Sequence, residues 1–306
     1  MTTSLAAPAS ARRLDWGRVT LWSARTVWLL VALVGGRAVG AAVDGRSDAV
    51  RWVTTIGAWT GWEAGALALA VTAVATLTAV RAVVPLALVA AAATAVFGAG
   101  AGDIAALAVP AAVASVLVGA ADTGQAYVQA SAYGDERRFG LRPPLGYLVP
   151  TIVSWVVWAV ALVTAPLAWA ARSWVLAAVA TVVLAAATAV LPRRWHQLSR
   201  RWFVAVPAGI VVHDPVVMAD TLMVMRARVA GVRLVAGARD PGVLDLSGPT
   251  AGIAMVVTLD EMTTAVFAPR RATPRGTAVH VGAFSVTPSR PGSVVRELAR
   301  RGLPVH

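Results

Sequence analysis

The chain of 306 residues contains no cysteine, and charged residues make up only 14% of it. The absence of cysteine excludes disulfide bonds, thiolate metal ligands and catalysis by a thiol. The charged fraction is low beside the roughly 25% of an ordinary soluble domain. Because 58% of the residues are hydrophobic, the composition indicates a protein that lies at least partly in a membrane.

Charge is missing over whole stretches of the chain, each long enough to form a membrane-spanning helix. No Asp, Glu, Lys or Arg occurs in residues 82–102, 104–121, 143–171 and 173–192. A bilayer core of about 30 Å needs about 20 apolar residues per helix. These runs therefore predict an integral membrane protein.

The apolar runs and the breaks between them predict an all-α membrane bundle of six transmembrane helices within residues 23–192. The spans are expected at about 24–43, 60–80, 82–97, 103–121, 147–168 and 173–191. A polar N-terminal segment, residues 1–22, precedes them without a signal-peptide cleavage site. A basic linker, residues 193–201, follows them.

The arginines predict how this bundle is oriented. Breaks on one side contain eleven arginines: Arg12, Arg13, Arg18, Arg81, Arg137, Arg138, Arg142, Arg193, Arg194, Arg200 and Arg201. Breaks on the other side contain three. Since arginine collects on the cytoplasmic side, both termini are predicted to be cytoplasmic and the protein to lie in the cell inner membrane. The net charge of +12 then indicates membrane lipids as partners, and no nucleic acid.

The polar residues that follow the fourth predicted span are expected to be solvated. Asp122, Gln125 and Gln129 recur at spacings of three and four, which places them on one helix face. The cluster at residues 135–138 is interpreted as a solvated loop, with contact to lipid phosphates or to the C-terminal part of the chain as the alternative.

Residues 202–306 predict a small β-rich cytoplasmic domain with a C-terminal helix. About seven short strands are expected, within 202–207, 210–213, 223–235, 243–246, 253–259, 264–267 and 279–286. The helix should begin near Pro291 and end at Gly302, with Val294, Val295 and Leu298 forming an apolar stripe.

The last strand and the helix carry a resemblance to a known family. The segment Phe284-Ser-Val-Thr-Pro-Ser-Arg-Pro-Gly-Ser-Val-Val-Arg-Glu-Leu resembles the end of bacterial pleckstrin-homology-like (PH-like) domains on small membrane proteins. The resemblance implies an open barrel capped by a helix, and an interaction role beside the membrane. The Pro207-Ala-Gly turn has no Arg or Lys, so inositol-lipid recognition is not implied.

All basic residues other than histidine are arginine, and alanine is abundant. This composition is typical of a high-GC, actinobacterial-type genome.

Two charges within the first two spans form a candidate site. A charge inside a span costs at least about 2.5–3.5 kcal/mol, so it usually faces a partner or a cavity. Arg37 lies about 9 Å, and Glu63 about 4–5 Å, inside the outer end of its span. The two are expected to pair, either structurally or as part of an outward-facing polar pocket. Gly-x-x-x-Gly patterns at residues 36–40 and 61–65 predict close contact of the two helices.

Other candidate sites are few. Arg270, Arg271 and Arg275 form a basic loop that could contact lipid or a protein partner. The four histidines lack metal-ligand spacing, and no nucleophile elbow, paired-carboxylate site or Walker motif occurs. We therefore expect no catalytic residues, no metal and no cofactor.

The sequence predicts a non-enzymatic inner-membrane scaffold or regulatory protein. Its PH-like domain would bind a protein partner on the cytoplasmic side or the membrane surface. The alternative is a small transporter or lipid-handling protein whose polar cavity includes Arg37, Glu63 and Asp103.

Overall fold

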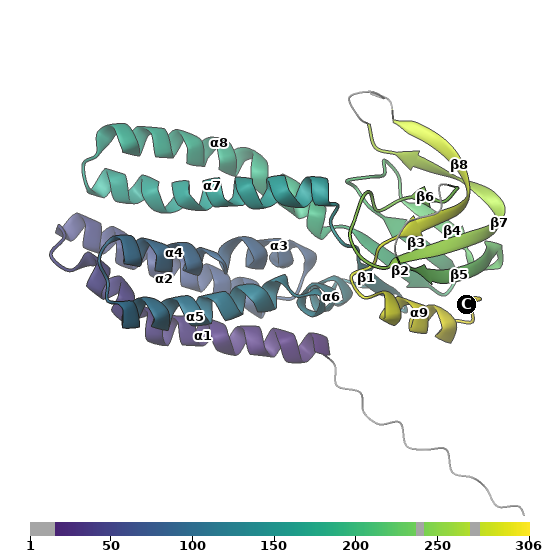
Figure 1. The fold of residues 1–306 in the computed structure, drawn as a ribbon, viewed down its shortest axis with the longest axis horizontal. Coiled ribbons are helices and arrows are strands. Elements are labelled where there is room, and N and C mark those ends of the chain that lie inside the picture. The colour runs from purple at the N-terminus through teal and green to yellow at the C-terminus, as the bar shows by residue number, and fades with distance from the viewer. Residues whose placement is uncertain (1–15, 237–241, 270–275) are drawn as a thin grey trace, which may run out of the picture.

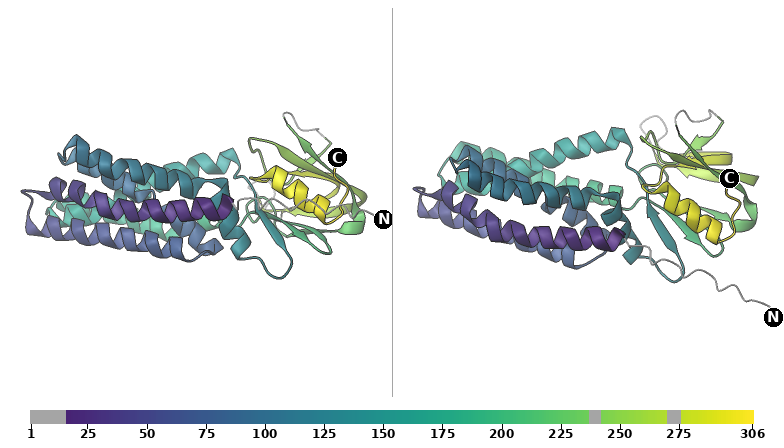
Figure 2. Two further views of the ribbon diagram at one scale, coloured as in Figure 1. Left: turned by 90° about the horizontal axis from the view of Figure 1, so that it is seen from below. Right: turned by 60° about the horizontal axis from the view of Figure 1, so that its bottom comes forward.

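The structure is a computed structural model that describes residues 16–236, 242–269 and 276–306. A bundle of long helices leads into a β-rich domain at one end, and the C-terminus lies in that domain (Figure 1). The two views of Figure 2 show the same arrangement, with the long helices side by side and the β domain beyond their ends.

Eight helices precede the β-rich domain among the described residues. They are α1 (Trp16–Val43), α2 (Asp48–Ala70), α3 (Val74–Val83), α4 (Leu86–Val96), α5 (Ala101–Gly119), α6 (Ala121–Ala130), α7 (Leu145–Ala170) and α8 (Trp174–Ser199). Five stretches are long and apolar enough to cross a membrane: α1, α5, α7, α8, and α3 continued by α4. The chain thus has the helices of a multi-pass membrane protein.

The first two helices pack differently from the expected contact between glycine pairs. A Cβ added at Gly36, Gly40 or Gly61 would meet nothing within 4 Å, so these glycines do not bring the helices together. A Cβ added at Gly65 would lie 2.5 Å from the Trp28 ring. Gly65 is therefore the glycine that brings α1 and α2 close together, because it leaves room for the Trp28 ring. It does not bring the two helix backbones into contact.

Tryptophans complete the contact between α1 and α2. The Trp28 indole donates to the carbonyl oxygen of Trp62, and the Trp62 indole donates to that of Trp28, both at 3.0 Å. Each buried donor is thereby satisfied in an apolar setting, where an unpaired N–H would be costly.

The β domain contains two four-stranded sheets within the described residues. The strands are β1 (Arg137–Gly140), β2 (Trp202–Val206), β3 (Gly209–His213), β4 (Leu222–Met225), β5 (Val229–Val235), β6 (Leu244–Asp245), β7 (Ala254–Phe267) and β8 (Thr277–Val286). Their orders are β1-β2-β3-β4 and β5-β7-β8-β6. The two strands expected at 253–259 and 264–267 are one strand, β7, whose register against β8 shifts between Thr258 and Thr263.

The C-terminal helix forms as predicted. Helix α9 spans Pro291–Arg300, and Gly302 follows with a φ of 72°, the left-handed region that favours glycine at a helix end. Val294 and Leu298 are fully buried in the core that fills the β domain. The helix therefore covers this core with its apolar stripe, as expected.

The first strand of the domain comes from the helical part of the chain. Strand β1 pairs antiparallel with β2, with Phe139 opposite Phe203 and Gly140 opposite Trp202. The backbone amides of Leu141 and Arg142 continue the connection by donating to the carbonyls of Arg201 and Thr287. The break between α6 and α7 is thus part of the β domain. Residues 137 and 138 therefore belong to a strand and not to a loop, although Asp135 and Arg137 are exposed as expected. The alternative, contact of this cluster with the C-terminal part of the chain, is confirmed.

A buried ion pair lies where these segments meet. Arg201, directly before β2, donates to both carboxylate oxygens of Asp214, directly after β3, at 2.8 and 2.5 Å. Both side chains have no exposed surface. Arg201 also donates to the carbonyls of Arg142 and Ser247, at 2.7 Å each. One guanidinium therefore holds together segments from four places in the chain.

We predict that Asp214→Asn lowers the free energy of unfolding by about 3–5 kcal/mol, because Arg201 would remain as a buried cation without its counter-charge. Thermal unfolding of the full-length protein in detergent measures this. The matched control is Glu261→Gln, which breaks the exposed ion pair with Arg228 and should cost less than about 1 kcal/mol. Equal effects of the two substitutions would contradict the prediction.

Candidate functional site at the junction of the helices and the β domain

The expected pair of Arg37 and Glu63 does not form in the structure. The Arg37 Nε lies 3.8 Å from an Asp103 carboxylate oxygen, and the Arg37 side chain is 87% exposed. Glu63 is exposed and forms no ion pair among the described residues. The reason is the packing of α1, which lies most closely along α5: a Cβ at Gly35 would be 2.7 Å from the Leu107 side chain.

The other sequence-based site cannot be placed. Arg270, Arg271 and Arg275 lie outside the described residues, so their contact with lipid or a partner stays a prediction. Among the described residues, no group of three or more His, Cys, Asp or Glu side chains could hold a metal ion.

The junction is organised by α6, which follows α5 after one residue. Tyr127 anchors α6 to the bundle, because its hydroxyl donates to the carbonyl of Ala68 in α2 at 3.0 Å. Burial raises the pKa of Tyr127 to about 12, so the hydroxyl stays protonated and keeps donating.

The opposite side of α6 binds β1. The Gln129 side chain accepts from the amide of Arg138 at 2.9 Å and donates to the carbonyl of Glu136 at 3.2 Å. The Gln125 side chain donates to the carbonyl of Arg138 and accepts from the amide of Gly140. The two glutamines, four residues apart, satisfy the outer edge of β1 as a neighbouring strand would.

Two ion pairs connect α9 to the same region. Arg290, before α9, pairs with Asp122 of α6. Arg301, after α9, donates to the carbonyl of Asp135 at 2.6 Å and to Glu297 at 2.7 Å. The polar face of α6 is therefore a docking face for β1 and α9, and the expectation of a solvated face was wrong. The spacing of the polar residues was visible in the sequence, but their partners lie 7 to 168 residues away.

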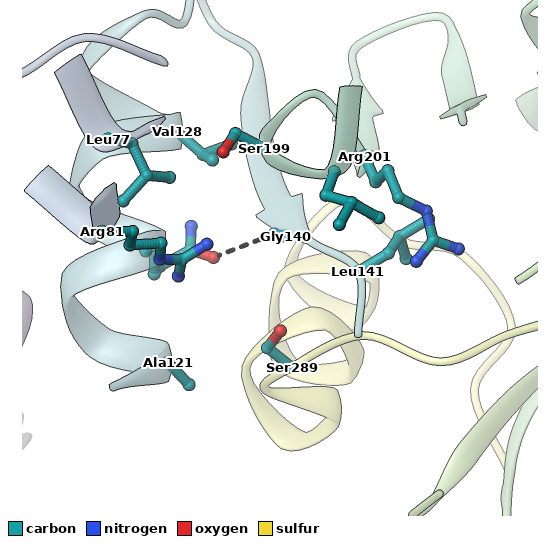
Figure 3. Close-up of a pocket in the computed structure, with 12 residues that line it drawn as sticks. Leu77, Arg81, Ala121, Val128, Gly140, Leu141, Ser199, Arg201 and Ser289 are labelled. Atoms are coloured by element: carbon teal, nitrogen blue, oxygen red, sulfur yellow. Dashed lines mark hydrogen bonds between the residues drawn. The ribbon is translucent and has the colours of Figure 1, made fainter. Parts of the chain in front are cut away.

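A cavity of about 40 Å³ opens at this junction (Figure 3). By the usual threshold of about 10–15 Å³ per water, it has room for about three water molecules. Its walls come from α3, α6, β1, the end of α8 and the turn before α9. The lining residues are Leu77, Arg81, Ala121, Gly124, Gln125, Val128, Gly140, Leu141, Leu198, Ser199, Arg201 and Ser289.

Arg81 provides the main unbalanced charge of the cavity. Its Nε donates to the carbonyl of Val118 at 3.5 Å, and no carboxylate of the described residues lies within 4.0 Å of it. The absence of a side chain at Gly124 admits the guanidinium, since a Cβ there would lie 2.7 Å from an Arg81 Nη. Arg201 also lines the cavity, but its charge is balanced by Asp214.

Comparison of the chain with family models, curated proteins and solved structures found no match. The structure shows a helical part with membrane-spanning helices and a β domain. The resemblance of this domain to PH-like domains stays a prediction.

We predict that acid loosens the attachment of α9. Hydrogen bonds from Arg300 and then Arg301 lower the pKa of Glu297 below its ordinary value of 4.5, against the effect of burial. This stabilisation is fully present above pH 4.5 and is lost as the pH falls through the lowered pKa of the folded protein. The hydrogen-exchange protection of residues 291–301, taken relative to the intrinsic exchange rate at each pH, should therefore fall below pH 4.5, and Glu297→Gln should remove this dependence. An unchanged pH profile in the variant would contradict the assignment.

Proposed function

We propose that the protein is a non-enzymatic inner-membrane scaffold or regulator. Its β domain binds a protein partner on the cytoplasmic side of the membrane and contacts the lipid surface. The observation that carries this proposal is the construction of the junction: β1, the Arg201–Asp214 pair and the α9 ion pairs attach the domain to the helix ends at many points. A domain so attached presents its surfaces in a fixed orientation to the membrane.

The exposed edge of one sheet is the surface that best suits a protein partner. Strand β4 ends the sheet β1-β2-β3-β4, and an edge strand offers unpaired backbone groups. Met223 and Met225 alternate with buried residues along β4, and each is 50% exposed. Methionine is flexible and adapts to the surface of a partner. We assign the partner to this edge.

The proposal includes six membrane crossings with both termini in the cytoplasm. Helix α1 runs from the end near the β domain to the far end, and α3 begins near the β domain again (Figure 1). Helix α2 connects them and, with 23 residues, extends about 34 Å. That length matches the hydrocarbon core, so α2 supplies the sixth crossing although Glu63 lowers its hydropathy.

Single cysteines test this topology cleanly because the chain has none of its own. We predict that a membrane-impermeant maleimide labels Ser47→Cys and Arg172→Cys in intact cells. Thr72→Cys and Ala219→Cys should be labelled only after the membrane is permeabilised. Labelling of Thr72→Cys from outside would show that α2 does not cross, and the six-span topology would fall.

Photo-cross-linking in intact cells tests the partner site. With a photoreactive amino acid at Met223, we expect a discrete cross-link to another polypeptide, and with the same group at Ala299, an exposed position on α9, none. Adding Met225→Glu should abolish the cross-link at unchanged protein abundance, since a charge would be buried at the contact. Equal cross-linking at both positions, or none at Met223, would contradict the assignment of a partner to β4.

A further inference from the structure

Arg81 has no counter-charge among the described residues, unlike several other arginines of the junction. Arg201 pairs with Asp214, Arg290 with Asp122, and Arg138 with Glu136. The Nη groups of Arg81 make no hydrogen bond to any described residue, and only its Nε does, at 3.5 Å. An ionisable side chain within a spanning segment usually faces a partner or a water-filled cavity. Arg81 is exposed, so its unused donors are accessible to an anion from outside the protein.

The cavity lies at the level where lipid headgroups are found. Leu77 and Arg81 belong to the apolar stretch Val74–Val96, within about 10 Å of its start. Leu198 and Ser199 are the last two residues of α8. Thr78 and His196 join the two stretches at this level, 3.1 Å apart. The cavity thus lies where two apolar stretches end, and the phosphate groups of a bilayer lie at that boundary.

A second group in the cavity suits an anion. The Ser289 hydroxyl forms no hydrogen bond among the described residues, and in Figure 3 it points towards the space that the Arg81 guanidinium also enters. Beside it in the chain, the Nε of Arg290 is buried and has no partner among the described residues. The Arg290 Nε is costly to bury without a partner, although Arg290 does not line the cavity. Ser289 is half-buried, so its hydroxyl can donate to an anion in the cavity.

We propose that this cavity binds a phosphate group, held by the Arg81 guanidinium and the Ser289 hydroxyl. The phosphate belongs to the headgroup of an anionic phospholipid of the inner leaflet, since the cavity lies at the ends of two apolar stretches. The bound headgroup connects α3 with the turn before α9, and so fastens the β domain to the membrane surface. This site deepens the lipid contact of the proposed function and rests on its cytoplasmic placement of the junction.

The test uses the full-length protein in detergent, titrated with dioleoyl phosphatidylglycerol and monitored by native mass spectrometry. Dioleoylglycerol, which has the same tails but no phosphate, serves as the control lipid. We expect tighter binding of the phosphatidylglycerol, and Arg81→Gln should weaken it about tenfold or more. Arg193→Gln removes an exposed arginine of α8 outside the cavity and should change it less than about twofold.

Two milder variants keep the test informative if Arg81→Gln fails to fold. Ser289→Ala removes one hydroxyl. Gly124→Ala introduces a Cβ 2.7 Å from the flexible end of Arg81, which would displace the guanidinium and leave the charge in place. Both should weaken binding of the phosphatidylglycerol by several-fold at an unchanged melting temperature.

Inorganic phosphate distinguishes the source of the group, with phosphorus NMR line broadening as the readout. Broadening that Arg81→Gln abolishes, with lipid binding unaffected by that variant, would establish a site for free phosphate and overturn the lipid assignment. Lipid and phosphate binding that are both insensitive to Arg81, Ser289 and Gly124 would overturn the site altogether. The cross-linking experiment at β4 does not involve Arg81. A failure of the proposed partner site can therefore be distinguished from a failure of the proposed phosphate site in the cavity.

Discussion

The Arg201–Asp214 ion pair is the interaction on which the union of the two parts depends. Burying two charges is expensive, and mutual attraction offsets the loss of hydration only where geometry is favourable and further hydrogen bonds are made. Here the guanidinium makes bidentate contact with the carboxylate and donates to two backbone carbonyls. Because these partners follow β1, β3 and β6, the pair can form only when all of these segments are in place. It therefore couples the order of the β domain to the position of the helix ends.

The shared strand β1 has the same consequence for the domain boundary. The sequence suggested a membrane unit ending at 192, a linker and an independent domain from 202 to 306. A chain cut at Arg201 would instead leave β1 without β2, and would leave Asp122 and Asp135 without their arginines. The proposed scaffold is thus a single structural unit. A displacement of the β domain would move β1 and therefore α6 and α7, which lie on either side of β1 in the chain.

The features that could be predicted from the sequence are those that depend on a local pattern of residues. Apolar runs predicted most of the long helices, although the span expected at 60–80 is divided between α2 and α3. The short apolar segments on either side of an Ala-Gly turn predicted β2 and β3, and Pro291 with Gly302 predicted the bounds of α9. The failures share one cause, which is that contacts between distant segments leave no local signal. Arg37 was paired with the neighbouring helix, whereas the glycine–leucine contact of Gly35 and Leu107 places it beside α5 and Asp103. The glutamines of α6 looked solvated because their hydrogen-bonding partner, β1, could not be recognised as a strand from four residues.

The same reasoning explains why Arg81 escaped notice as a site. In the sequence it was one of eleven arginines that set orientation, and nothing in its neighbours distinguished it. Only the fold shows that Arg201 and Arg290 pair with carboxylates, while Arg81 enters a cavity opposite the Ser289 hydroxyl, which forms no hydrogen bond with the described residues. An arginine near the end of a span can satisfy itself by reaching to lipid phosphates outside the protein. Gly124 also leaves room for the guanidinium against α6, and because Arg81 stays exposed, an anion can reach it from outside the bundle. The headgroup that we propose would then be part of the attachment between the bundle and the β domain.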